Sequence, residues 1–128
     1  MFADELVRLA AGNCVPPDGQ YRLLGAADCE QQRRYLPPEW GITADQQAVA
    51  ALQRRFRCRD YPQAAALTQR IATLAEAVNH HPSLLLEWCQ LTLRINTHAV
   101  NGLAIGDFVF AAKAELLARK FGVIDESN

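Results

Sequence analysis

Residues 88–97 alternate apolar and polar side chains with a strict period of two. The apolar positions are Cys89, Leu91, Leu93 and Ile95, and the polar ones are Gln90, Thr92, Arg94 and Asn96. Because side chains along a β-strand point alternately to the two faces of its sheet, this pattern predicts a strand from Trp88 to Thr97 with one buried and one wet face. Such strands are typical of antiparallel sheets covered on one side. The chain must therefore supply helices that cover the apolar face.

Two amphipathic stretches are expected to provide this cover. A helix is predicted from Asp60, its expected N-cap, to Asn79, where Pro82 displaces the chain from helical geometry. Its apolar stripe is Leu67, Ile71, Leu74 and Val78. A last helix is predicted from Ile105 to Lys120, with Gly122 as its stop. Its inner side is expected to be Phe108, Ala112, Leu116 and Phe121.

The remaining segments complete an α+β fold. We expect a short helix over Cys29–Tyr35 with Asp28 as N-cap, a strand opened by Trp40 and Ile42, and a strand over Leu52–Arg59. The order of elements predicts a small antiparallel β-sheet with helices packed on one face. The breaker cluster Val15–Gly19 separates residues 1–24, an N-terminal extension expected to be loosely packed, from a domain over residues 25–128.

Composition excludes several classes of protein. The chain has 128 residues, 50% of them hydrophobic and 21% charged, with a formal net charge of -1. This balance predicts one soluble domain without the basic field that direct nucleic-acid binding needs. Neither a membrane-spanning run nor a signal peptide is visible. The arginines of residues 54–59 are expected on a solvated strand face. The four cysteines lack C-x-x-C spacing, which favours a reduced, cytoplasmic protein.

All three histidines, His80, His81 and His98, lie within residues 80–98. Histidine exchanges protons near neutral pH, so this clustering favours an acid–base site over a satisfied core histidine. Glu76 is expected beside His80 on one helix face, and Asp107 in the first turn of the last helix. If the strand end lies over the helix end, the imidazoles and carboxylates converge. Metal binding is not expected, because adjacent His80 and His81 would point apart in a helix.

The pattern Glu76-x3-His80-His81-Pro82-x5-Trp88-x9-His98-x8-Asp107 resembles the signature of the pterin-4a-carbinolamine dehydratases, bacterial branch. Further similarity is seen at Arg55–Tyr61, Leu36–Trp40 and Gly102-Leu103, and the resemblance covers about residues 26–120. A departure is Ala104, where the family has Thr or Ser, so that the last helix lacks a side-chain N-cap. Trp88 is expected to pack in the core or an interface.

The resemblance implies a dehydratase, a lyase that converts 4a-hydroxytetrahydropterin to quinonoid dihydropterin and water. It implies His80, His81 and His98 as the acid–base set, oriented by Glu76 and Asp107, with Asn79 and Thr97 hydrogen-bonding the pterin. No metal and no cofactor are implied. The substrate would come from an aromatic amino acid hydroxylase, which places the chain in tetrahydrobiopterin recycling or biosynthesis, and family members form homodimers or homotetramers.

A second class of function stays open from the sequence. Some proteins of this fold are inactive as enzymes and act as transcription cofactors or as Rubisco assembly factors of carboxysomes, and fold alone does not choose between these roles. The intact His80-His81-Pro82 and Thr97-His98 segments favour the enzyme, because a purely scaffolding protein would not need them.

Overall fold

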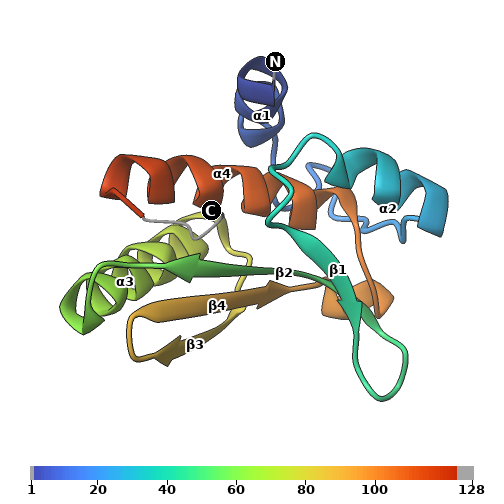
Figure 1. Cartoon of the computed structure of the whole chain (residues 1–128). Coiled ribbons are helices and arrows are strands. Elements are labelled where there is room, and N and C mark those ends of the chain that lie inside the picture. Colours follow the sequence, from blue (N-terminus) through green and yellow to red (C-terminus); the bar gives the residue numbers. More distant parts are fainter. Residues whose placement is uncertain (1, 124–128) are drawn as a thin grey trace.

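The computed structural model describes residues 2–123 and contains a four-stranded antiparallel sheet and four α-helices. The elements in chain order are α1 (Phe2–Ala10), α2 (Ala26–Arg33), β1 (Gly41–Ala44), β2 (Ala50–Arg57), α3 (Tyr61–Val78), β3 (Ser83–Glu87), β4 (Gln90–Ile95), the short 3₁₀ turn η1 (His98–Val100) and α4 (Ile105–Phe121). The strand order is β1-β2-β4-β3, and α3 and α4 cover one face of the open sheet (Figure 1). The predicted α+β class is confirmed.

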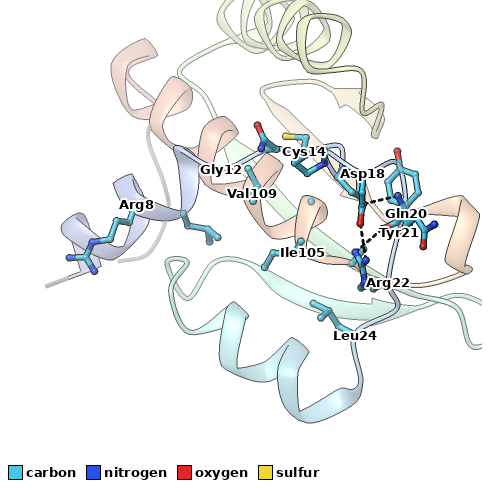
Figure 2. Close-up of a pocket in the computed structure, with 16 residues that line it drawn as sticks. Arg8, Gly12, Cys14, Asp18, Gln20, Tyr21, Arg22, Leu24, Ile105 and Val109 are labelled. Atoms are coloured by element: carbon cyan, nitrogen blue, oxygen red, sulfur yellow. Dashed lines mark hydrogen bonds and ion pairs between the residues drawn. The ribbon is translucent and has the colours of Figure 1, made fainter.

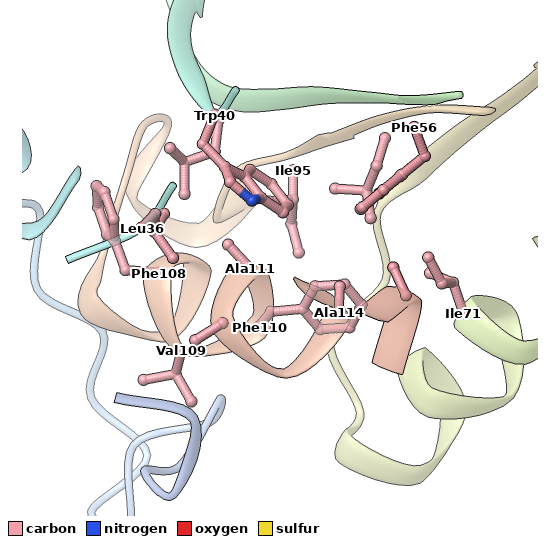
Figure 3. Close-up of a cluster of buried hydrophobic side chains, with 14 of the residues drawn as sticks. Leu36, Trp40, Phe56, Ile71, Ile95, Phe108, Val109, Phe110, Ala111 and Ala114 are labelled. Atoms are coloured by element: carbon pink, nitrogen blue, oxygen red, sulfur yellow. The ribbon is translucent and has the colours of Figure 1, made fainter. Parts of the chain in front are cut away.

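The register of the central strands directs apolar side chains toward α4. Leu52 lies opposite Ile95, and Phe56 lies opposite Leu91, and all four are buried. Trp40, just before β1, meets Phe56 edge to face, with ring centroids 6.1 Å apart. Figure 3 shows these rings above α4. This apolar layer fixes α4 against the sheet, and with it the end of the helix that carries Asp107.

The segment before the predicted strand folds differently from the expectation. Residues 83–95 form two strands, β3 and β4, joined by Trp88 and Cys89, where one strand from Trp88 to Thr97 was expected. The Leu84–Leu86 run hid the period of two, because Leu85 faces outward and is half exposed. Trp88 lies in the turn with φ 55 and is 81% exposed, so of the two expected places, the core and an interface, the core is excluded and the interface stays a prediction.

The helix boundaries follow the sequence only in part. Asp60 caps α3 as expected, since its carboxylate accepts the N–H of Gln63 at 2.9 Å. α2 begins three residues before the prediction, at Ala26, and its N-cap is Gly25 instead of Asp28. Asp28 lies in the first turn, where a carboxylate favours the helix dipole without capping a backbone N–H.

The N-terminal segment packs on the side of α4 away from the sheet (Figure 1). Leu6 and Cys14 are buried, and the Lys113 ammonium on α4 donates to the Ala10 carbonyl oxygen at 2.7 Å. The sequence analysis expected residues 1–24 to be loosely packed, whereas these contacts tie the described part closely to α4. As a result α4 is covered on two opposite sides.

A buried ion pair connects β2 with α4. Arg54 shares the inward parity of Leu52 and Phe56, so the expectation of a solvated arginine face is wrong at this position, where the side chain is 1% exposed. Its Nε and Nη2 atoms donate to the Glu115 carboxylate at 3.0 and 3.2 Å. Trp40 Nε1 donates to the same carboxylate at 2.9 Å. A charged residue at an inward position is thus matched by a carboxylate on the covering helix.

Removing this carboxylate charge should destabilise the fold strongly. We expect Glu115→Gln to lower the free energy of unfolding by about 3–5 kcal/mol, because the Arg54 guanidinium stays buried without its counter-charge. The matched control is Glu30→Gln, which removes an exposed carboxylate 3.6 Å from Arg33 and should cost at most about 1 kcal/mol. Urea denaturation measures both values, and equal losses would contradict the assignment.

Candidate active site

The backbone reversal at the end of α3 directs His80 toward the protein interior. The helix ends at Val78, and Asn79 takes the left-handed conformation with φ 55 and ψ 44. The His80 N–H then donates back to the Ala75 carbonyl oxygen at 3.1 Å, which closes the last helical turn. Asparagine tolerates this conformation better than most residues. The reversal leaves His80 only 8% exposed, while the side chain of Asn79 lies at the surface.

His80 is bonded to a fully buried carboxylate. Its Nε2 atom lies 2.7 Å from Asp107 Oδ1, and Asp107 Oδ2 accepts the Thr97 hydroxyl at 2.7 Å and the Ala104 N–H at 2.9 Å. Because a carboxylate is an acceptor, the proton of this pair belongs on Nε2 of His80, and the other ring nitrogen, Nδ1, keeps its lone pair when the ring is neutral. Asp107 therefore fixes the tautomer of His80.

The same carboxylate replaces the absent side-chain cap of α4. Ala104 occupies the N-cap position and offers no side-chain acceptor, as the sequence predicts. Its N–H is satisfied by Asp107 Oδ2, while the Asp107 N–H donates to the Ala104 carbonyl oxygen at 3.1 Å. Asp107 is thus seated by the helix that it helps to begin.

Glu76 pairs with a different histidine from the one expected. The sequence analysis placed it beside His80, but its Oε1 atom lies 3.0 Å from His81 Nε2. The four-residue spacing of a helix no longer applies beyond Val78, because Asn79 reverses the backbone. This second pair faces solvent, with His81 57% and Glu76 84% exposed at their side chains.

His98 begins η1 directly after Thr97 and is exposed, whereas Thr97 is buried. The Thr97 N–H donates to the Gly102 carbonyl oxygen at 2.8 Å, which closes the loop that carries His98. Hydrogen bonds thus unite His80, Thr97 and Asp107 in one buried group, and His81 and His98 are each the next residue after one of its members.

The sequence analysis missed Phe110 as a neighbour of the site. Its ring meets the His80 imidazole nearly at right angles, with centroids 6.2 Å apart. Phe110 follows Asp107 by three residues on α4, and this spacing was the available signal, because residues three apart are neighbours on a helix. Asp107 and Phe110 therefore hold the imidazole from one helix.

A cavity of about 660 Å³ lies elsewhere, between residues 8–24 and the first turns of α4. None of the predicted site residues lines it. Within residues 2–123, no set of three or more His, Cys, Asp or Glu side chains is arranged to hold a metal ion. Over the same residues, no helix combines the length and hydropathy needed to cross a membrane.

Comparison with known proteins identifies relatives along most of the chain. The family described as "Pterin 4 alpha carbinolamine dehydratase" matches residues 22–117. A protein of Chlorobaculum tepidum named "Putative pterin-4-alpha-carbinolamine dehydratase" is 35% identical over 112 residues, which are 88% of this chain and 99% of the relative. A Gloeobacter violaceus protein with the corresponding name, numbered 1, is 39% identical over 101 residues, 79% of this chain and 85% of its own.

A solved structure shares the fold. The crystal structure of a transcriptional coactivator/pterin dehydratase from Brucella melitensis superposes with a TM-score of 0.67 at 24% identity, and the match covers 76% of this chain and 99% of the other. At this identity the likeness shows the fold alone. Together with the match over residues 22–117 and the identities to the two bacterial proteins, it leads to one conclusion: this chain belongs to the pterin-4-alpha-carbinolamine dehydratase family.

Proposed function

We propose that this protein is a dehydratase that converts 4a-hydroxytetrahydropterin to quinonoid dihydropterin and water. The observation that carries the proposal is the buried group of His80, Asp107 and Thr97, joined by two hydrogen bonds of 2.7 Å. An imidazole with a fixed tautomer suits a reaction made of proton transfers, and two exposed imidazoles directly follow members of this group in the chain, His81 after His80 and His98 after Thr97. Membership of the family supplies the substrate class.

The reaction needs one acid and one base. The acid protonates the 4a-hydroxyl group, the C–O bond breaks and water leaves with the bonding electrons. The base takes the proton of a ring N–H, and that electron pair forms the new double bond. One proton is given and one is taken, no electrons are exchanged with another reagent, and each transfer is typically worth about 10²–10⁴-fold in rate.

The three histidines differ in their surroundings, which supports a different role in proton transfer for the buried one than for the two exposed ones. His80 is buried, and Asp107 orients its ring through the hydrogen bond to Nε2. His81, paired with Glu76, and His98 are exposed and can exchange protons with water. Thr97 donates its hydroxyl proton to Asp107, which supports a role in positioning that carboxylate, while the pterin contact implied by the resemblance stays a prediction.

The cysteines and the sheet edges bear on the compartment and the oligomeric state of the protein. None of the four cysteines, all of which lie within residues 2–123, forms a disulfide, which fits the reducing cytoplasm that we propose for this protein. β1 and β3 lie at the edges of the sheet, and Leu85 and Trp88 are exposed at the β3 edge. Open apolar edges favour pairing with another chain, so we propose a homodimer or homotetramer acting in tetrahydrobiopterin recycling, with its substrate supplied by an aromatic amino acid hydroxylase.

Loss of either site imidazole should abolish most of the activity. We expect His80→Ala and His98→Ala each to lower kcat/KM for dehydration of the 4a-hydroxypterin by about 10²–10⁴-fold, the usual contribution of a general acid or base. Stopped-flow absorbance measures the reaction, and circular dichroism checks folding. Thr73→Ala, on the exposed side of α3, is the control and should keep full activity. Full activity in both histidine variants would rule out the assignment.

Variants of Thr97 distinguish positioning of the Asp107 carboxylate from direct binding of the substrate. Thr97→Val keeps the shape but removes the hydroxyl that donates to Asp107, so we expect kcat to fall by about tenfold, the value of one buried hydrogen bond to a charged group, with little change in KM. Thr97→Ser keeps the hydroxyl and should restore most of the rate. A raised KM with unchanged kcat would instead assign the hydroxyl to the pterin.

Variants of Asn79 test whether activity depends on its left-handed backbone conformation or on its side-chain amide. Glycine adopts its left-handed conformation freely, whereas alanine pays about 1 kcal/mol or more there. We therefore expect Asn79→Gly to keep stability and activity, and Asn79→Ala to lose stability in urea denaturation. A strong loss of activity in the stable glycine variant would show that the amide contacts the substrate.

A further inference from the structure

The first turn of α4 is covered by backbone from the N-terminal segment. Gly106 directly precedes Asp107, and a Cβ atom at Gly106 would collide with the carbonyl group of Cys14. The obstructing atoms belong to the backbone, so they cannot move aside as a flexible side chain can. Glycine at this position thus allows residues 12–24, which we call the N-terminal strap, to lie directly on the helix beside the buried carboxylate.

The strap also contacts the loop that joins Thr97 to Asp107. The Leu24 N–H donates to the Leu103 carbonyl oxygen at 2.8 Å, and the Leu23 side chain lies 2.7 Å from where a Cβ of Gly102 would be. Gly102 is the residue that accepts the Thr97 N–H. The strap therefore contacts both the middle and the end of the segment that connects Thr97 to Asp107.

Between these contacts the strap bridges the cavity of about 660 Å³ described above. Figure 2 shows it crossing the start of α4, with Cys14, Asp18 and Arg22 on the strap and Ile105 and Val109 on the helix. The strap is braced within itself, because the Arg22 guanidinium donates to the Asp18 carboxylate at 2.9 Å and to the Gln20 carbonyl oxygen at 3.0 Å.

We propose that the N-terminal strap is a positioning element of the active site. Its contacts with Gly106 and with the Gly102–Leu103 loop keep the Asp107 carboxylate where it can hydrogen-bond to His80 and Thr97. Most of the strap, up to Tyr21, precedes the part of the chain that matches the family. Merely anchoring α1 would not require these contacts, since Leu6 and the Lys113–Ala10 bond already do so. The inference rests on the proposed function only for its kinetic readout.

The test compares Gly106→Ala with Gly25→Ala. A Cβ at Gly106 displaces the strap, whereas a Cβ at Gly25 meets nothing within 4 Å, so the second variant controls for the added methyl group. The first readout is alkylation of Cys14 by iodoacetamide at pH 8. Burial raises the pKa of this thiol to about 11, so it reacts slowly unless the strap opens. Cys58, which is buried and directly follows β2, is the internal reference for global unfolding.

The second readout is the proton on His80 Nε2, which the bond to Asp107 should make visible as a slowly exchanging imidazole N–H signal in ¹⁵N-resolved spectra. We expect Gly106→Ala to speed alkylation of Cys14 but not of Cys58, to weaken the imidazole signal, and to lower kcat by at least about tenfold with KM nearly unchanged. Gly25→Ala should match the wild type in all three.

Each result of these measurements either supports the proposed role of the strap or overturns it. Faster Cys14 alkylation with an unchanged His80 signal would overturn the proposal, as would unchanged alkylation in Gly106→Ala. If all the cysteines of Gly106→Ala react together, Leu23→Ala replaces it: this exposed side chain can be trimmed without a backbone clash, and a weakened imidazole signal supports the proposal while an unchanged one overturns it. If the wild type lacks dehydratase activity, the proposed function fails, but alkylation and the imidazole signal still test the strap.

Discussion

The carboxylate of Asp107 is completely buried, and the geometry of the site depends on it. A carboxylate withdrawn from water costs several kcal/mol unless donors replace its hydration. Here the donors are His80 from the end of α3, Thr97 from the end of β4, and the Ala104 N–H at the start of α4. Since all three must reach one group, burying this acid fixes the positions of the ends of α3, β4 and α4 relative to one another.

A second buried acid on the same helix ties this arrangement to the sheet. Glu115 accepts from Arg54 on β2 and from Trp40 before β1, so α4 is held to the strands by directional bonds as well as by apolar packing. One helix thus carries an acid that secures it to the sheet and an acid that orients His80. The buried part of the site is therefore connected to the core by hydrogen bonds at both acids, although Thr97 and His98 lie outside the strands and α-helices.

The sequence predicts the local elements better than their connections. The period of two at 88–97 and the stripe on α3 are signals that survive folding, because each depends on one face being buried. Arg54 and β3 were missed for the opposite reason: a charge at an inward position and a leucine at an outward one both contradict the pattern. The Glu76–His81 pair and the strap were missed because each depends on where the backbone turns in space, which hydropathy does not record.

The unequal burial of the histidines constrains how protons can move. The Nε2 atom of His80 is occupied by Asp107 and its ring is packed against Phe110, so any proton that this residue exchanges with a substrate passes through Nδ1. At 8% exposure His80 has little direct access to water, and a proton it accepts must be passed on before the next turnover. His81 follows it in the chain and is exposed, and its Nε2 atom lies 3.0 Å from Glu76 Oε1. Under the proposed function, the fixed imidazole meets the substrate and the exposed ones restore the proton balance with solvent, which explains why one site would need more than one histidine.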